Sequence, residues 1–120
     1  MHELGIAQSI YDIVQQSVPE ELAPDVRRIR IKLGQLAGVI PDSLDFCFNI
    51  LVSETKMKQA ALCIEQVPLI SECRECQCRF QVEDMIFLCP SCQSSNLELI
   101  SGKELEIVDI EVAEKGDEAL

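Results

Sequence analysis

The chain has 120 residues, of which 48% are hydrophobic and 26% charged, and its formal net charge is −11. This negative charge excludes nucleic acid as a main partner, because phosphate binding needs clustered Lys and Arg. No segment approaches the roughly 20 apolar residues needed to span a bilayer, and the start lacks the basic and apolar regions of a secretory signal, so we expect a cytoplasmic protein without a membrane partner.

The first predicted element is an amphipathic helix from about Glu3 to Ser17, which should end near Pro19. Its apolar residues recur at the three- and four-residue spacing of one helix face: Leu4, Ala7, Tyr11, Val14 and Val18. From Arg28 to Leu33, basic and apolar residues alternate, which predicts a half-buried strand. The basic residues here are interpreted as a solvated strand face, in preference to a docking patch for an acidic partner: Arg27, Arg28, Arg30 and Lys32.

Further elements follow the strand. Gly34 and Gly38 bracket a turn or loop, and Pro41 opens a second helix whose apolar residues are Leu44, Cys47, Phe48 and Leu51. Residues 60–67 read as a second strand that ends at Pro68. A third strand is predicted from Lys103 to Val112, with an apolar face that switches near Val108. The acidic residues 113–120 are expected to fray.

Between the second and third strands, residues 69–102 contain too few apolar runs to build a core of their own. This insert carries two CxxC pairs, Cys73 with Cys76 and Cys89 with Cys92, separated by twelve residues. Two such pairs can complete a tetrahedron of thiolates around one ion, and zinc fits this set as a structural ion with no open position. Iron in a rubredoxin-like cage would use the same four thiolates.

Three further cysteines need separate interpretations. Cys78 either replaces Cys76 as a ligand or is a free thiol, and we favour the free thiol. Cys47 and Cys63 lie on apolar stretches and are predicted to be small buried hydrophobic residues.

His2 is the only histidine and follows directly on Met1. The Met1 amine, the His2 amide and the imidazole would form fused chelate rings, and the Glu3 amide could occupy a fourth corner. The first amides of a helix have no acceptor within it, so a metal could displace their protons without breaking a helical hydrogen bond. Four nitrogens in a plane suit Ni(II) or Cu(II) and suit zinc poorly. Met1 should be retained, because His2 is not a small residue.

The combination of these features resembles the HypA/HybF family of nickel chaperones in NiFe-hydrogenase maturation. The resemblance covers nearly the whole chain and rests on Met1-His2-Glu3-Leu4, on residues 34–39, on the Pro41-led helix and on the CxxC pairs. It implies an α+β fold with two helices packed on a three-stranded sheet as a nickel domain, residues 1–68 plus 103–120. The zinc-ribbon-like zinc domain would be residues 69–102.

The resemblance also implies roles. His2 would bind Ni(II) as transient cargo, with Glu3 in support, and Cys73, Cys76, Cys89 and Cys92 would hold a structural Zn(II). Nickel would pass to the NiFe-hydrogenase large subunit together with a HypB-type GTPase, and in some bacteria to urease maturation factors. Some relatives recruit a further histidine from the zinc domain, whereas this chain has none there, so water, a carboxylate or a partner would complete the site.

A different class of function stays open at this stage: a zinc-ribbon interaction module without a nickel role. An enzyme is not expected, because a cysteine nucleophile needs a histidine base and only His2 is available. The sequence leaves both a monomer and a homodimer open.

Overall fold

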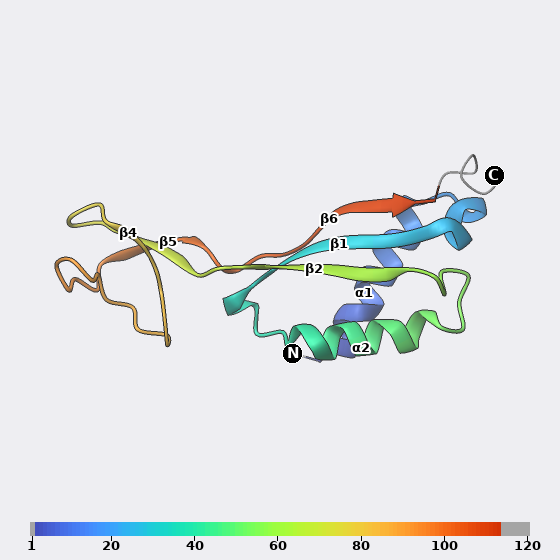
Figure 1. Cartoon of the computed structure of the whole chain (residues 1–120), viewed down its shortest axis with the longest axis horizontal. Helices are drawn as coiled ribbons and strands as arrows, with labels where there is room; N and C mark the ends of the chain where they lie inside the picture. The colour runs from blue at the N-terminus through green and yellow to red at the C-terminus, as the bar shows by residue number, and fades with distance from the viewer. Residues whose placement is uncertain (1, 114–120) are drawn as a thin grey trace.

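A computed structural model describes residues 2–113; Met1 and most of the acidic end, residues 114–120, lie outside the described part. The molecule is elongated, with extents of 60 × 30 × 22 Å. Both α-helices and the larger sheet occupy one end, and a smaller sheet lies at the other (Figure 1). None of the helices in the described residues is long and apolar enough to cross a membrane.

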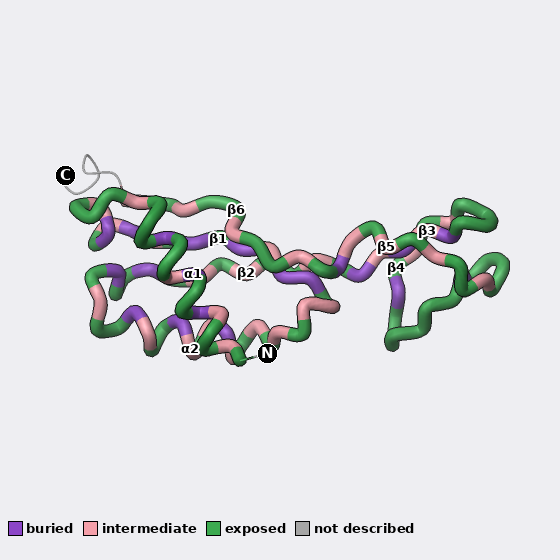
Figure 2. Tube along the Cα trace, turned by 180° about the vertical axis from the view of Figure 1, so that it is seen from behind, coloured by how far each residue is buried: buried purple, intermediate pink, exposed green. Residues whose placement is uncertain are grey.

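The helices begin where the sequence predicts. Helix α1 (Glu3–Ser17) buries Ala7, Ile10 and Val14 on one face. Of the other residues in the predicted face, Tyr11 and Val18 are half-buried, whereas Leu4 is exposed, contrary to the prediction. Helix α2 (Pro41–Val52) begins with proline, whose missing amide is harmless in a first helical turn, and buries Leu44, Phe48 and Val52. Both helices lie on the same face of the larger sheet (Figures 1 and 2).

The larger sheet has the order β2-β1-β6, with β2 (Ala61–Val67) parallel and β6 (Leu105–Val112) antiparallel to β1 (Val26–Gly34). Two short 3-10 helices flank β1: η1 (Glu20–Asp25) precedes it and η2 (Gln35–Ala37) follows it. Strand β1 forms the centre of the core, and its Ile29 and Ile31 are almost fully buried. This arrangement confirms the expected α+β fold of two helices on a three-stranded sheet.

A register shift explains why the apolar face of the third strand switches near Val108. Arg30 pairs with Asp109 and Ile31 pairs with Ile107, so Val108 has no counterpart on β1 and is 51% exposed. Such a β-bulge reverses the face to which the following side chains point.

The sheet face opposite the helices is charged and open to solvent. Arg30 Nε lies 3.0 Å from an Asp109 carboxylate oxygen, and Arg28 lies 3.9 Å from Glu111. This agrees with the predicted solvated strand face. The prediction that Cys63 is buried is wrong: it is exposed, because it lies beside Arg30 in the parallel register, on the uncovered face. Cys47 is half-buried.

The smaller sheet is antiparallel with the order β4-β3-β5, from β4 (Arg79–Gln81), β3 (Ile70–Cys73) and β5 (Leu97–Ser101). Little is buried around it: Leu69, Ser71, Cys73, Val82 and Cys89. Its long loops are largely exposed (Figure 2). The expectation that this segment lacks an apolar core of ordinary size therefore agrees with the structure.

A close backbone contact joins the two sheets. The Gly34 amide donates to the Glu104 carbonyl at 2.6 Å, and the Leu36 amide donates to the Gly102 carbonyl at 2.7 Å. A Cβ on Gly34 would overlap the carbonyl carbon and oxygen of Gly102. Gly102 itself has φ +126°, which side chains disfavour. Only glycine at both positions permits this narrow crossing of the chain.

Candidate metal sites in the cysteine cluster and at the amino terminus

The two CxxC pairs sit on two turns with the same backbone hydrogen bonds. In the first, the Gln77 amide donates to the Cys73 carbonyl at 2.9 Å, and in the second the Gln93 amide donates to the Cys89 carbonyl at 2.7 Å. Both glutamines have positive φ, 62° and 63°. Each turn therefore presents its two cysteines to the same side, as a metal knuckle requires.

The four sulfurs of these turns form one cluster, because all four Sγ atoms lie within 4.8 Å of one another. The Sγ atoms of Cys73 and Cys92 are 3.5 Å apart, as are those of Cys76 and Cys89. A tetrahedral ion with metal–sulfur bonds of about 2.3 Å needs sulfurs about 3.8 Å apart, so the cluster fits such an ion. Since four thiolates would fill the tetrahedron, the ion would cross-link the turns and leave no position for a reacting molecule.

The protonation of the metal-free cluster is uneven. Burial opposes ionisation of the Cys89 thiol, but the amides of Cys92 and Ser91 and two neighbouring thiols donate to its sulfur and lower its pKa to about 6. At Cys76, hydrogen bonding from the Cys78 amide favours the thiolate, yet the Cys89 sulfur, burial and the remaining sulfurs together raise the pKa to about 12. Near neutral pH the metal-free cluster therefore holds a thiolate at Cys89 beside a protonated thiol at Cys76. A metal must displace protons to bind.

Cys78 does not belong to the cluster of four. Its carbonyl accepts the Cys73 amide at 2.8 Å, just as the Ser94 carbonyl accepts the Cys89 amide at 2.9 Å in the second turn. Cys78 and Ser94 thus occupy equivalent positions in the two turns, and each stabilises its turn through its backbone carbonyl. The Cys78 sulfur accepts a hydrogen bond from Ser91 Oγ at 3.5 Å. Of the two alternatives for Cys78, this geometry favours the one without a ligand role.

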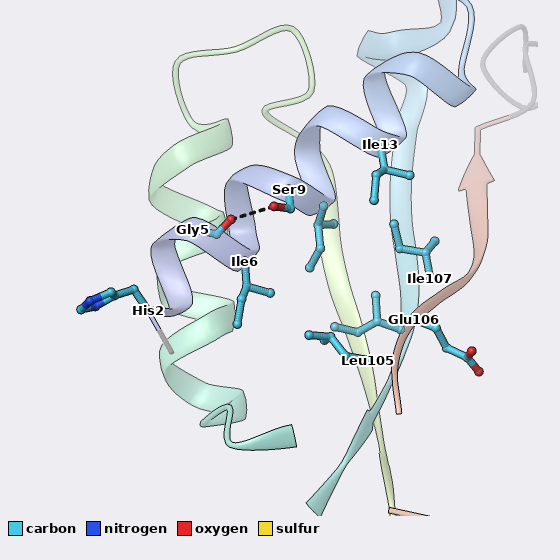
Figure 3. Close-up of a pocket in the computed structure, with 10 residues that line it drawn as sticks. His2, Gly5, Ile6, Ser9, Ile13, Leu105, Glu106 and Ile107 are labelled. Carbon is cyan, nitrogen blue, oxygen red and sulfur yellow. Dashed lines mark hydrogen bonds between the residues drawn. The ribbon is translucent and has the colours of Figure 1, made fainter. Parts of the chain in front are cut away.

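His2 occupies the N-cap position of α1, with extended backbone (φ −90°, ψ 119°) and no hydrogen bond from its side chain to the helix. Its carbonyl accepts the Ile6 amide at 3.2 Å, which is the first hydrogen bond of the helical type. The residue is exposed, and its ring extends away from the helix (Figure 3). Both ring nitrogens are therefore accessible to a ligand.

Glu3 is held by the second helix. Ser43 Oγ, in the first turn of α2, donates to Glu3 Oε1 at 3.3 Å. This hydrogen bond ties the starts of α1 and α2 together, and Ser43 had no signal in the sequence beyond its place after Pro41.

The structure thus brings the four predicted cysteines together but leaves the amino-terminal ligand set open. Met1, whose amine is part of the predicted set, lies outside the described residues. Within residues 2–113, the four cysteines are the one group of three or more metal-binding side chains close enough to share an ion. No described side chain from another element joins His2 in such a group.

Comparison with known proteins gives relatives along the whole described chain. The family model for hydrogenase/urease nickel incorporation metallochaperones, HypA, matches residues 1–112. The hydrogenase maturation factor HypA of Desulfatibacillum aliphaticivorans is 39% identical over 95% of this chain and 88% of its own. That of Desulfosudis oleivorans is 38% identical over 95% of this chain and 100% of its own.

The fold is likewise similar to solved structures. The solution structure of the Ni metallochaperone HypA from Helicobacter pylori aligns with a TM-score of 0.62 at 21% identity, covering 93% of this chain and 97% of that one. Another HypA solution structure aligns with a TM-score of 0.66 at 21% identity, covering 94% and 97%. From the family match and the relatives together, the chain belongs to the HypA family, whose members are not enzymes but metallochaperones for nickel incorporation in hydrogenase maturation.

Proposed function

We propose that this chain carries Ni(II) on the Met1 amine, the His2 imidazole and the first amides of α1. The observation that carries this proposal is the position of His2, an exposed imidazole at the start of a helix with no hydrogen bond of its own to that helix. The amides at the start of a helix lack acceptors, so the Glu3 amide is available to a metal as well. A planar set of nitrogens favours Ni(II) over Zn(II), so the nickel cargo and the structural zinc would bind at different sites.

We further propose that Cys73, Cys76, Cys89 and Cys92 bind Zn(II). The fit of the four sulfurs to a tetrahedron supports this assignment, as does the small amount of apolar burial around the smaller sheet. The division into a nickel domain, residues 1–68 plus 103–120, and a zinc domain, residues 69–102, belongs to the same proposal. It is supported by the separate sheets, since β3, β4 and β5 all lie between residues 69 and 102.

The recipient of nickel in this proposal is the large subunit of a NiFe hydrogenase, with a HypB-type GTPase as the accompanying partner. A cytoplasmic location is part of the proposal, because that is where such a subunit would be matured. Urease maturation factors are a second class of recipient, since the matched family description includes urease nickel incorporation.

Nickel titration tests the amino-terminal site. The untagged protein is compared with a version carrying one extra residue before Met1 and with His2→Ala, while Gln16→Ala, an exposed position on the same helix, is the control. We expect both changes at the amino terminus to weaken nickel binding strongly and Gln16→Ala to leave it unchanged. X-ray absorption of the loaded protein should report nitrogen ligands in a planar geometry. Unchanged affinity in both terminal variants would refute the amino-terminal site, and a lack of nickel binding by the unaltered protein would favour the interaction module without a nickel role.

Metal analysis tests the zinc site. Cys73→Ser should lower bound zinc and increase hydrogen exchange in residues 69–102. Cys63→Ser is the matched control, because Cys63 is a cysteine outside the cluster. If Cys73→Ser retains a full equivalent of zinc, the ligand set is refuted. The same metal analysis shows whether the bound ion is zinc or iron.

A further inference from the structure

A groove runs between α1 and the edge strand β6, over a part of the sheet that α1 and α2 leave uncovered. Its volume is about 750 Å³. Its apolar lining comes from one face of α1 and from β1 and β6: Ile6, Ile10, Ile13, Ile31, Leu105 and Ile107. Figure 3 shows Ile6, Ile13, Leu105 and Ile107 directed into the space between helix and strand.

The lining is incompletely buried. Ile13 is 50% exposed and Leu105 is 37% exposed. Single exposed apolar residues are ordinary, but here they border one continuous hollow. A second molecule that fills the hollow would remove this apolar surface from water, which is favourable.

The shape of the site favours a helix as the occupant. A sheet in a layered fold is normally covered by helices packed side by side on its face. In this chain, α1 and α2 provide two such helices for three strands, and the groove lies where a third would pack beside α1, above β6. An amphipathic helix placed there would complete the layer, as in helix-in-groove recognition.

Charge determines which helix fits. The charged residues of α1 are acidic, Glu3 and Asp12, and Glu106 is the acidic residue among those that border the groove, whereas no Lys or Arg borders it. A partner helix with Lys and Arg beside its apolar stripe would complement these walls. A second copy of this chain is disfavoured, because the net charge is −11. The chain's own end is disfavoured as well, because residues 114–120 contain three acidic residues and one Lys.

We propose that this groove binds a basic amphipathic helix of the protein that receives nickel. His2 lines the amino-terminal end of the groove with its ring directed away from it, so a docked helix would lie beside the residue that is proposed to bind nickel. The identification of the partner as the nickel recipient rests on the proposed function, whereas recognition of a basic helix by the groove does not.

The first experiment measures peptide binding to the nickel-free, zinc-containing full chain. The probe is a synthetic helical peptide of about 15–18 residues with Leu on one face and Lys on the other, long enough to lie along α1. A scrambled peptide of the same composition controls for simple charge attraction. Ile13→Asp is compared with Ile50→Asp, a charge-matched change at a position on α2 that is 57% exposed and outside the groove. Leu105→Ala is a second groove variant should Ile13→Asp fail to fold.

We expect the amphipathic peptide to bind the wild-type chain and Ile50→Asp equally, and to bind Ile13→Asp about tenfold more weakly or worse. The scrambled peptide should bind weakly to all three. Equal binding of both peptides, or equal loss in both variants, would overturn the proposal. A concentration-dependent dimer that Ile13→Asp dissociates would assign the groove to a second copy. Tighter peptide binding by residues 1–113 alone would assign it to the chain's own end.

The second experiment measures nickel transfer. Ile13→Asp should slow transfer to the purified hydrogenase large subunit or its GTPase partner by about tenfold, while release to a small chelator stays at the wild-type rate. Unchanged transfer together with lost helix binding would overturn the assignment of the helix to the nickel recipient. A chain that binds the peptide but no nickel would refute the proposed function and leave the groove's specificity standing.

Discussion

Cys78 and Ser94 occupy the same place in two copies of one six-residue turn. In each copy the first cysteine amide donates to the carbonyl five residues later, and its own carbonyl accepts the amide four residues later. Since the residue at the sixth place contributes its carbonyl, a thiol and a hydroxyl are interchangeable there. The four ligand cysteines could be predicted from their spacing. Whether Cys78 is a fifth candidate ligand could not, because the sequence does not show that its carbonyl closes the first turn.

Replacement of Cys78 should therefore be tolerated. We expect Cys78→Ser to keep one equivalent of zinc and its thermal stability, because the Cys78 carbonyl remains available to the Cys73 amide. Cys76→Ser, two residues away, should lose most of its zinc. Metal analysis and a thermal melt of both variants check this expectation. A larger zinc loss in Cys78→Ser than in Cys76→Ser would show that the ligands are exchanged.

Ser43 is predicted to position the amino-terminal nickel site. Its hydroxyl fixes Glu3, so Ser43→Ala should weaken nickel binding about threefold, the effect of one modest hydrogen bond. Ser43→Thr should restore the affinity, because it retains the hydroxyl. Ser53→Ala is the control, since Ser53 donates to the Ile50 carbonyl at the other end of α2. Titration calorimetry measures the affinities, and circular dichroism should show equal helix content in all four proteins. An Ala variant with wild-type affinity would remove Ser43 from the site.

At the level of elements, helix periodicity predicted α1 with its observed bounds and placed the start of α2 correctly. The face switch on the third strand was visible in the sequence, but its cause, a bulge at Val108 opposite Arg30 and Ile31, needed the pairing register. The apolar neighbours of Cys63 in the sequence predict that it is buried. Its exposure depends on which face of β2 the helices leave open, and that is a property of packing between elements.

Two glycines in different elements should respond oppositely to the same substitution. Gly34→Ala should lower the free energy of unfolding by about 1–3 kcal/mol or more, because the new Cβ would overlap the Gly102 backbone. Gly5→Ala, in α1, has no atom within 4 Å of the added Cβ, so its helix propensity should raise stability by up to about 1 kcal/mol. Urea unfolding of zinc-containing protein measures both. Equal effects of the two substitutions would contradict the crowded crossing.

At the scale of the whole molecule, stability is divided unevenly. The larger sheet has a conventional apolar core between strands and helices, whereas the smaller sheet buries only Leu69, Ser71 and Val82 besides two of the cysteines. This division could be anticipated from the scarcity of apolar runs in residues 69–102. The α1–β6 groove could not, because a hydrophobic helix face in a sequence does not show which part of it lacks a covering layer.

Zinc retention should depend steeply on pH. In the metal-free cluster the pKa of Cys76 is raised to about 12 and that of Cys92 is also raised, so at neutral pH zinc must displace at least these two protons. The affinity should then fall by at least about a hundredfold for each unit of decreasing pH. Below about pH 6 the fall should steepen, because Cys89, with its pKa lowered to about 6, also takes up a proton. Competition with a chromophoric chelator from pH 5 to 8 measures this slope, and a pH-independent affinity would contradict it.

Removal of zinc should affect the two ends differently. With a chelator present, amide exchange in residues 69–102 should approach that of unfolded chain, while α1, α2 and β1 keep their protection, because their core contains none of the four cysteines. Hydrogen exchange with mass spectrometry resolves the two regions. Simultaneous loss of protection at both ends would instead show one cooperative unit.

The strand order of the larger sheet also determines how the molecule would respond to mechanical force. The chain leaves the larger sheet at the end of β2 and returns at the start of β6, and these strands flank β1 on opposite sides. A force applied to the smaller sheet along the long axis would therefore displace β2 and β6 in the same direction relative to β1. Both ladders would be loaded in shear, with their hydrogen bonds sharing the tension, and neither would unzip bond by bond. A partner bound to residues 69–102 would therefore exert force on them without separating the strands of the larger sheet one hydrogen bond at a time.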